Sequence, residues 1–378
     1  MHIAIPVERS AGETRVAATP ETVRKLVAQG HAVAVENGAG ARAGIADADW
    51  IAAGARVAPD RRAALAGADI VFKVRAPAAD ELDDYPAGAA VIGLMQPHDN
   101  TLLPAMAARG LSVYALELLP RTTRAQSMDV LSSQNNVAGY RAVLTAAQYY
   151  PRFMPLMMTA AGTVKPARVL ILGAGVAGLQ AVATAKRLGA VVEVFDVRAA
   201  TREQVESLGA KFVEVEMSEE EKAGSQGVYA QEMSADYLRR QGELIARHAA
   251  AADIVISTAL IPGRPAPRLL PAAAVEAMRA GSVVVDLAAA SGGNCELTRP
   301  GSVWVTPGGV TVVGDDNLPG RLAADASSLY ARNLLAFAAL LLTPAAPDAA
   351  PDPLLTATLI AGGGELRWPR ADAHQEKA

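Results

Sequence analysis

The sequence predicts an α/β fold with mostly parallel sheets. Short apolar segments of strand length alternate with helical patterns, and one of these segments runs directly into a glycine-rich turn. Two long helical stretches also mark the places where the chain would cross between domains. With 378 residues, the chain is long enough for two domains that each bury a core.

Composition excludes several classes of protein. Charged residues make up 20% and apolar residues 51% of the chain, which is too apolar for a disordered protein. The formal net charge of −4 argues against nucleic acid as a partner, because nucleic-acid binding needs a basic surface. The single cysteine, Cys295, excludes an internal disulfide framework, and the scattered histidines indicate no metal site.

Neither end of the sequence predicts a membrane segment. Glu8 and Arg9 interrupt the stretch in which a signal peptide needs a continuous apolar core. The longest apolar run near the end, residues 334–342, is far shorter than the ~20 residues of a spanning helix. We therefore expect a soluble, cytoplasmic protein, which could still dock on a membrane partner.

The first domain is predicted from apolar strands separated by helical stretches. Thr19, Pro20 and Glu21 form a helix start, with proline in the first turn and an acid behind it, and Gly30 ends that helix. The strand segments are residues 2–6, 31–36, 70–74, 90–94 and 111–115.

The second domain is predicted to begin in a long helix, residues 128–150, and a helix over residues 323–342 would return to the first domain. The strands between them are residues 168–172, 191–195, 254–257, 282–286 and 310–313. We predict two Rossmann-like domains, residues 1–127 plus 318–378 and residues 128–317, joined by two crossings with a cleft between them. Residues 217–227 are expected to form a mobile loop, residues 344–353 a linker, and residues 354–368 a terminal hairpin around a glycine triplet.

The glycine-rich turn GAGVAG carries the clearest functional signal. Gly173 allows a tight turn out of the strand, Gly175 lets the backbone approach a pyrophosphate, and Gly178 lets the next helix lie close to the sheet. Ala174 and Val176 lie at the helix N-terminus, where free N–H groups and the helix dipole attract phosphates. The alternative is a plain tight turn, but the strand, the helix and a following acid together favour a dinucleotide site.

That acid is Asp196, which ends the next strand and lies 18 positions after Gly178. A carboxylate at this spacing accepts hydrogen bonds from the ribose hydroxyls and repels a 2′-phosphate. The pattern therefore favours NAD(H) over NADP(H). Arg198 is the one feature that points the other way, since an arginine here can bind the phosphate.

A second stretch, residues 121–136, concentrates hydrogen-bonding side chains at the predicted domain junction. One interpretation is a polar helix cap, with Asp129 or Ser127 capping the long helix. The other is a set of groups that fix a nicotinamide carboxamide, which needs both a donor and an acceptor.

At this point the sequence resembles a known family. The motifs that carry the resemblance are RxxRAQSMDxLSSQ, NxAGYRA, TAAGTVKPARVLILGAGVAGLQA, STALIPGRPAP and VDLAAASGGNC. They are similar to the NAD(H)-binding component, domain I of the alpha subunit, of proton-translocating nicotinamide nucleotide transhydrogenase, over residues 3 to about 342. Alanine dehydrogenase is a fold relative that shares the opening PxExxxxExRVAxTP but lacks the RAQSMD segment.

The resemblance implies a role for each matching residue. Arg121, Asp129 and Ser132 would hold the nicotinamide end of NAD(H), Gln126 would lie at the reaction face, and Tyr229 would fold over the bound nucleotide from a mobile loop. Arg121, Gln126, Asp129 and Tyr229 would thus be the catalytic group. The remaining cofactor-binding residues would be Gly173, Ala174, Gly175, Val176, Gly178, Asp196, Val197, Arg198, Val228, Gln241 and Leu260, although Val228 interrupts the family's usual Gly-Tyr pattern.

The resemblance also implies the reaction and the partners. The chain would be an enzyme of the Si/Re-specific transhydrogenase type, active only in complex. Hydride would pass directly between NAD(H) here and NADP(H) on domain III of a beta subunit, and a membrane-spanning domain II would couple this to proton movement. The chain would be a homodimer, peripheral to the inner membrane through these partners.

A self-sufficient NAD-linked amino-acid dehydrogenase of the alanine dehydrogenase type is the alternative, and a nucleotide-sensing protein without turnover is a third hypothesis. A substrate dehydrogenase needs a proton donor, whereas direct transfer between two nicotinamide rings does not. The candidates are His98, Lys73, Arg15 and a carboxylate after the strand that ends at Asp286, but residues 288–291 supply none. Asp286 is equally consistent with a site residue and a turn cap, and Cys295 is expected to be packed rather than nucleophilic.

Overall fold

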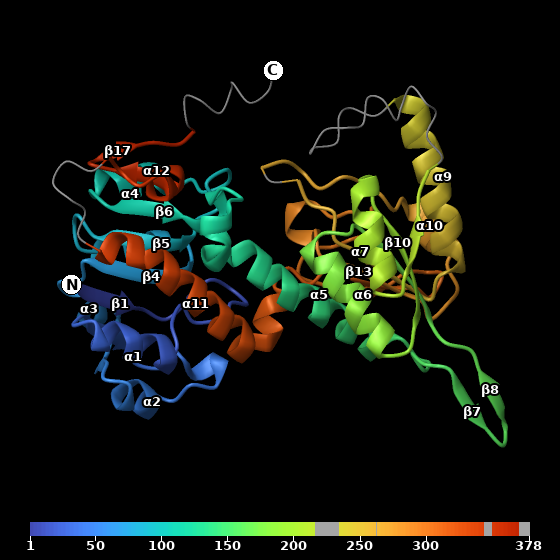
Figure 1. Cartoon of the computed structure of the whole chain (residues 1–378), viewed down its shortest axis with the longest axis horizontal. Helices are drawn as coiled ribbons and strands as arrows, with labels where there is room; N and C mark the ends of the chain where they lie inside the picture. The colour runs from blue at the N-terminus through green and yellow to red at the C-terminus, as the bar shows by residue number, and fades with distance from the viewer. Residues whose placement is uncertain (216–233, 262, 344–349, 370–378) are drawn as a thin grey trace. The chain divides into compact units, whose positions relative to one another are not determined.

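A computed structural model describes residues 1–215, 234–261, 263–343 and 350–369 (Figure 1). The chain divides into two compact units. Unit 1 comprises Met1–Gln134 and Pro319–Ala378, and unit 2 comprises Asn135–Leu318. Each unit is built on a mostly parallel sheet, so the predicted fold class is confirmed.

Unit 1 has an eight-stranded sheet in the order β3-β2-β1-β4-β5-β6-β16-β17. The first six of these strands run parallel, and β16 and β17 are antiparallel additions at one edge. The strands are β1 (His2–Ile5), β2 (Ala32–Glu36), β3 (Arg56–Ala58), β4 (Ile70–Arg75), β5 (Ala90–Leu94), β6 (Ser112–Ala115), β16 (Leu359–Gly362) and β17 (Glu365–Leu366).

Helices cover both faces of this sheet and bury one core on each side. The α-helices are α1 (Pro20–Ala28), α2 (Asp47–Ala52), α3 (Arg61–Leu65), α4 (Leu103–Ala108), α11 (Ala323–Leu342) and α12 (Pro353–Thr358). Helices α1 and α11 pack on one face and α4 on the other. The short 3-10 helices are η1 (Ala41–Ala43), η2 (Ala79–Asp84), η3 (Leu116–Leu118) and η4 (Thr123–Met128), and η7 (Leu318–Leu322) crosses the boundary between the units.

Local sequence explains where two of these helices begin. Thr19 caps α1 by accepting a hydrogen bond from the Thr22 N–H, and Pro20 occupies the first position, as predicted. Asp352 caps α12 in the same way, followed by Pro353. The predicted terminal hairpin is therefore partly wrong: residues 353–358 are helical, and only β16 and β17 form the hairpin around Gly363 and Gly364.

Unit 2 has a seven-stranded sheet in the order β11-β10-β9-β12-β13-β15-β14, with only β14 antiparallel. Side chains alternate along β9: Val169 and Ile171 join the core on one face, and Leu170 and Leu172 join the core on the other. The strands are β9 (Arg168–Leu172), β10 (Val191–Phe195), β11 (Lys211–Val213), β12 (Ile254–Ser257), β13 (Val283–Asp286), β14 (Val303–Val305) and β15 (Thr311–Val313).

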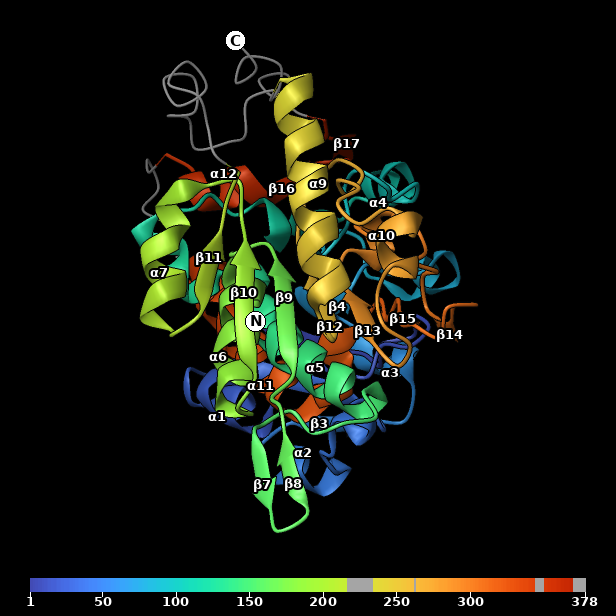
Figure 2. The ribbon, with the colours of Figure 1, turned by 90° about the vertical axis from the view of Figure 1, so that its right-hand side faces the viewer.

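The helices of unit 2 divide between the two faces of its sheet (Figure 2). One face is covered by α6 (Val176–Arg187) and α7 (Arg202–Ser207), and the other by α9 (Ala235–Ala251) and α10 (Ala272–Glu276). The 3-10 helices η5 (Ala199–Thr201) and η6 (Ala289–Ser291) follow β10 and β13. A separate hairpin, β7 (Met157–Thr159) with β8 (Gly162–Val164), projects from unit 2 and was not foreseen (Figures 1 and 2).

The predicted long helix is α5 (Val130–Tyr149), and the boundary between the units falls within it, after Gln134. Helix α11 has the bounds predicted for it and belongs to unit 1. The segment predicted as a mobile loop, residues 217–227, lies outside the described residues, as does most of the predicted linker.

Candidate functional site

The glycine-rich turn lies where the strand order of unit 2 reverses. Strand β9 has β10 on one side and β12 on the other, which is the point at which open α/β sheets bind ligands. Gly173 has φ of +106°, and a Cβ there would lie 2.6 Å from Oγ1 of Thr258. A Cβ on Gly178 would lie 1.8 Å from the Gly173 carbonyl oxygen. Both positions therefore need glycine for the fold itself.

Gly175 needs no such explanation from packing. A Cβ built on it would meet no atom within 4 Å, and its φ of −78° suits any residue. Gly175 is the residue that precedes α6, and no described side chain caps the helix there. The N-terminal N–H groups of α6 are thus presented beside a backbone that a ligand can approach closely, which suits a pyrophosphate.

Asp196 lies beside this turn and is already held in place. Its Oδ2 accepts from the Ala174 N–H at 2.7 Å, and its Oδ1 accepts from the Arg198 N–H at 2.8 Å. The Arg198 guanidinium also contacts both oxygens, at 3.0 and 2.9 Å. Burial alone raises the pKa of a carboxyl group, but these hydrogen bonds outweigh it and hold the pKa of Asp196 below its ordinary value.

This arrangement changes the interpretation of Arg198. Its guanidinium is engaged by Asp196, and the pair raises the pKa of Arg198, so the arginine is already neutralised by the acid beside it. Its side chain keeps 46% of its surface exposed and could move aside for a ribose. The adjacent Val197 is half-buried and packs against the core beneath α9.

Two residues that the sequence analysis missed hold the turn from the next strand. Oγ1 of Thr258 donates to the carbonyl oxygens of Leu172 and Gly173, at 3.2 Å each. The fully buried Asn294 brackets Ala259 with two hydrogen bonds, accepting from its N–H and donating to its carbonyl. The signal was present in the motif STALIPG, but the partners lie too far apart in sequence for a local pattern to pair them.

Gly139 is the third missed residue. It lies inside α5, and a Cβ there would stand 2.1 Å from the carbonyl oxygen of Ala177 in the first turn of α6. A glycine inside a helix costs about 1 kcal/mol relative to alanine, so its presence indicates close packing. Gly139 therefore lets α5 support the start of the phosphate-facing helix.

The other predicted nucleotide contacts in unit 2 differ in accessibility. Leu260 follows β12 and is 48% exposed, so it is available to a ligand. Gln241 lies in α9 and is buried. Val228 and Tyr229 lie outside the described residues. The roles of all four toward a nucleotide stay predictions.

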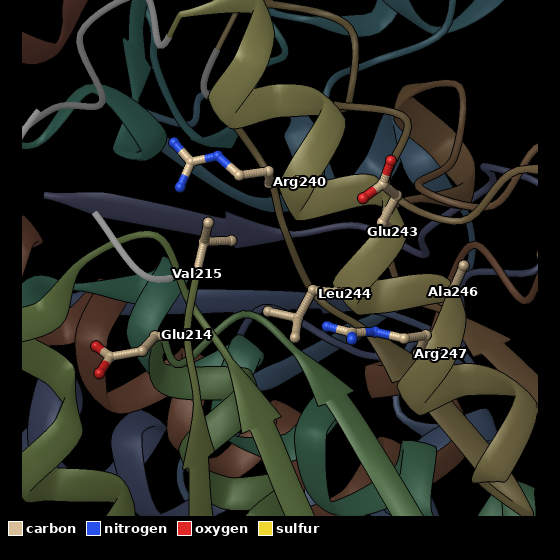
Figure 3. A pocket seen from close by; sticks show the side chains of 7 residues that line it. All are labelled: Glu214, Val215, Arg240, Glu243, Leu244, Ala246 and Arg247. Carbon is tan, nitrogen blue, oxygen red and sulfur yellow. The ribbon is translucent and has the colours of Figure 1, made fainter. Parts of the chain in front are cut away.

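A groove of about 780 Å³ lies beside α9, at the carboxyl end of β11 (Figure 3). Val215 and Leu244 supply its apolar wall. Its charged lining residues are Glu214, Arg240, Glu243 and Arg247. It contains none of the predicted site residues, so it is not the candidate nucleotide site.

The polar stretch of unit 1 forms η4 and the start of α5. Ala125 and Met128 are buried in the unit 1 core, three residues apart, and therefore lie on one side of the 3-10 helix. This leaves Gln126 exposed, and Arg121 is exposed just before η4. The structure thus places Arg121, Gln126, Asp129 and Ser132 close together along the chain, and all four belong to unit 1.

Asp129 acts as the cap that one interpretation foresaw. Its Oδ1 accepts from the Ser132 N–H at 2.9 Å, and its Oδ2 accepts from the Ser132 hydroxyl at 2.6 Å. Capping leaves carboxylate lone pairs available, so the cap does not exclude a second role toward a carboxamide.

The acid–base candidates in unit 1 are paired with other side chains. Nζ of the buried Lys73 lies 3.3 Å from Oε2 of Glu8, and Arg15 forms a two-point contact with Glu13 at 2.6 and 2.7 Å. His98 is exposed, and its ring packs edge-on against Trp368 at 4.9 Å between centroids.

The two remaining candidates, in unit 2, are structural. Asp286 is fully buried and accepts from the hydroxyls of Ser257 and Thr298 and from the N–H groups of Ala288 and Cys295. Burial raises the pKa of the Cys295 thiol, which disfavours the reactive thiolate. Asp286 is therefore a turn cap and Cys295 a packed residue.

In the part of the chain that the structure describes, no helix combines the length and apolar character needed to cross a membrane.

Two family models together match almost the whole chain. The alanine dehydrogenase/PNT N-terminal domain matches residues 4–138, and the alanine dehydrogenase/PNT C-terminal domain matches residues 142–369. Among solved structures, a transhydrogenase from Sinorhizobium meliloti superposes with a TM-score of 0.87 at 48% identity, covering 97% of this chain and 100% of that one. An L-alanine dehydrogenase superposes with a TM-score of 0.82 at 29% identity, covering 98% of each chain.

Curated relatives separate the two branches. An NAD(P) transhydrogenase subunit alpha of Rhodospirillum rubrum is 51% identical over 343 residues, which is 89% of this chain and 89% of that protein. The alanine dehydrogenase of Halomonas elongata is 30% identical over 348 residues, covering 89% of this chain and 86% of that protein. The chain therefore belongs to the alanine dehydrogenase/PNT family and, within it, to the NAD(P) transhydrogenase alpha subunits.

Proposed function

We propose that this chain is the NAD(H)-binding component of a proton-translocating transhydrogenase. The bound nicotinamide would supply or accept a hydride, exchanged directly with NADP(H) on a separate subunit. The observation that carries the choice of NAD(H) is the Asp196 carboxylate, fixed beside the glycine-rich turn by the Ala174 N–H. A 2′-phosphate would meet this negative charge, whereas ribose hydroxyls would donate to it.

The residues of the chain fit such a nucleotide and divide the work of holding it. Gly175, Ala174 and Val176 would bind the pyrophosphate through backbone N–H groups at the start of α6, and Asp196 would orient the adenosine ribose. Leu260, exposed after β12, would pack on the nucleotide.

Residues of unit 1 would bind the other end of the cofactor. Arg121 would donate to the carboxamide, and Asp129 with Ser132 would accept from it and donate to it. Gln126 would lie at the reaction face. Because direct transfer requires no proton donor from the protein, this assignment is consistent with an Asp286 that is wholly occupied and with a Lys73 paired with Glu8.

The proposal extends to the assembly. We infer a homodimer that pairs with an NADP(H)-binding beta subunit, domain III, and with a membrane-spanning subunit, domain II, that couples hydride transfer to proton translocation. The support is the relationship to subunits named as components of one enzyme. The chain would then lie in the cytoplasm, at the inner membrane through these partners.

Alanine dehydrogenase activity is the second candidate, supported by the 29% identity to a solved L-alanine dehydrogenase. An assay of the purified chain separates the two. We expect no NADH oxidation with pyruvate and ammonium, and hydride transfer between NADH and an NADP⁺ analogue once a recombinant NADP(H)-binding component is added. Oxidation by pyruvate and ammonium without a partner would overturn the proposal.

Gln126→Asn tests the reaction face. In the reconstituted complex we expect slower hydride transfer with NADH affinity nearly unchanged, because the residue would act on alignment rather than on ground-state binding. A large loss of NADH affinity would instead place Gln126 in the ground-state binding site.

A further inference from the structure

The 3-10 helix η4, which carries Gln126, is held from three directions within unit 1. Ala125 and Met128 anchor its inner side in the core. Two other contacts reach it from segments at the far end of the sequence, α11 and α12, which are the orange and red helices of Figure 1. Neither contact follows from the local sequence of η4.

The first contact comes from Asn333 in α11. Its Nδ2 donates to the Ser127 carbonyl oxygen at 2.8 Å, across 206 residues of sequence. Its Oδ1 is buried without a hydrogen-bond partner among the described residues. A buried acceptor without a partner costs stability, so folding alone does not account for an asparagine here. What the amide provides is a donor directed at the backbone next to Gln126.

The second contact comes from Asp352, the cap of α12. The Arg124 guanidinium contacts both of its carboxylate oxygens, with Nη1 at 3.1 Å from Oδ1 and Nη2 close to Oδ2. The same carboxylate accepts from the Leu354 N–H at 2.8 Å, which fixes it on the helix. The arginine side chain is 55% exposed, and an exposed ion pair contributes little to stability. Its two-point geometry nonetheless fixes orientation.

We propose that Asn333 and the Arg124–Asp352 pair are positioning residues for hydride transfer: they fix η4 so that Gln126 is held in register. The inference rests on the proposed function, because it takes Gln126 to lie at the reaction face. It gives the segment after the predicted linker a task, since α12 then supports the reaction geometry as well as the sheet edge. A displacement on the order of 1 Å can slow an aligned transfer about 100-fold, so small shifts of η4 matter.

The test uses Arg124→Gln, Asp352→Asn, their double variant and Asn333→Ala in the full chain. Asparagine keeps the capping ability of position 352, so the helix start is preserved. Lys25→Gln is the matched control, because Lys25 forms an equally exposed ion pair with Glu21 in α1, away from η4. Three quantities are measured: NADH Kd by calorimetry, the thermal unfolding midpoint, and the hydride-transfer rate at saturating nucleotide with a recombinant NADP(H)-binding component.

We expect each single variant to slow hydride transfer roughly 3- to 10-fold while the Kd stays within about twofold and the midpoint within about 2 °C of wild type. The Arg124/Asp352 double variant should be no slower than either single one, because both remove the same contact. The control should match wild type. Wild-type rates in all positioning variants, or rate losses matched by equal losses of affinity or of folding, would overturn the inference.

The proposed function fails in a different way. If the reconstituted wild-type complex transfers no hydride, or if Gln126→Asn is as fast as wild type, the reaction face itself is misplaced. If Gln126→Asn is slow while the positioning variants are fast, only the positioning inference falls.

Discussion

The two units share one sheet order but finish it differently at the point where that order reverses. In unit 2, the reversal between β9 and β12 is left to bare backbone, the glycine-rich turn, with Thr258 bracing it. In unit 1, the reversal between β1 and β4 is filled by a side chain. Glu8 accepts from the N–H groups of Val74 and Arg75, at 2.6 and 3.2 Å, and pairs with Lys73.

The chemistry of the buried acids follows the same division. In unit 1, Glu8 and Glu13 are compensated by the cations Lys73, Arg15 and Arg75. In unit 2, Asp286 is compensated by neutral hydroxyl and N–H donors. A fold that offers a ligand-binding edge therefore becomes a nucleotide site only where the edge is left uncovered, and the same edge becomes a structural centre where it is filled.

The largest expected effect tests the filled edge. Lys73→Met should lower the free energy of unfolding by about 3–5 kcal/mol, because it leaves the buried Glu8 without its cation. Urea titration measures this, with Lys25→Met, in an exposed pair, expected within about 0.5 kcal/mol of wild type. Adding Glu8→Gln to Lys73→Met should recover part of the loss. Equal effects of the two lysine variants would contradict the comparison.

The next effect tests the open edge. Gly175→Ala should leave the unfolding midpoint unchanged, because its Cβ meets no protein atom, yet weaken NADH binding by about 10- to 100-fold, or ~1.4–2.7 kcal/mol. Gly242→Ala is the control, since its Cβ in α9 also meets open space and lies outside the predicted site. Calorimetry of NADH binding decides. Unchanged affinity in Gly175→Ala would mean that no ligand approaches this backbone.

A smaller, pH-dependent effect tests another acid at the carboxyl edge of unit 1. Burial raises the pKa of Glu117 to about 7, although the Gln96 N–H donates to it at 2.5 Å. Between pH ~4.5 and ~7 the folded protein keeps a proton that the unfolded chain has lost, so this group's contribution to stability falls as pH rises through that window.

Glu117→Gln should remove that loss. Relative to wild type, the variant should gain roughly 1–2 kcal/mol between pH 5 and pH 8, as measured by urea midpoints at both values. Parallel pH dependence of the two proteins would refute the assignment. Glu13 has the opposite sign: burial on its own raises its pKa, but Arg15 and Arg75 hold it at about 2, so its contribution is lost only in acid.

The smallest effect concerns selectivity. Asp196→Asn should weaken NADH binding by about 5- to 10-fold and reduce the discrimination against NADPH, because the negative charge beside the ribose is lost while the side chain can still accept from Ala174. Competition binding with the two nucleotides measures the ratio. An unchanged ratio would show that Asp196 does not read the ribose.

Sequence reasoning succeeds where the signal is local. The bounds of α11, the strand before the glycine-rich turn and the acid at the end of β10 follow from runs of apolar residues and from short spacings. It fails where a contact joins distant segments. Thr258, Asn294 and Asn333 act on backbone 35 to 206 residues away, and no local pattern pairs such groups.

The remaining error is local and avoidable. Residues 354–358 resemble part of a hairpin strand because they include apolar residues and precede glycines. Asp352 followed by Pro353 is a helix start, and it outweighs the apolar run.

The discontinuity of unit 1 has a consequence for synthesis. Strand β6 leaves the ribosome early, but its antiparallel neighbour β16 emerges only after the whole of unit 2. Until then β6 presents an unpaired edge, the kind of surface on which chains associate wrongly. Unit 2, continuous in sequence, can mature first, so the nucleotide-binding turn would be complete on a nascent chain whose first domain is still waiting for its last strands.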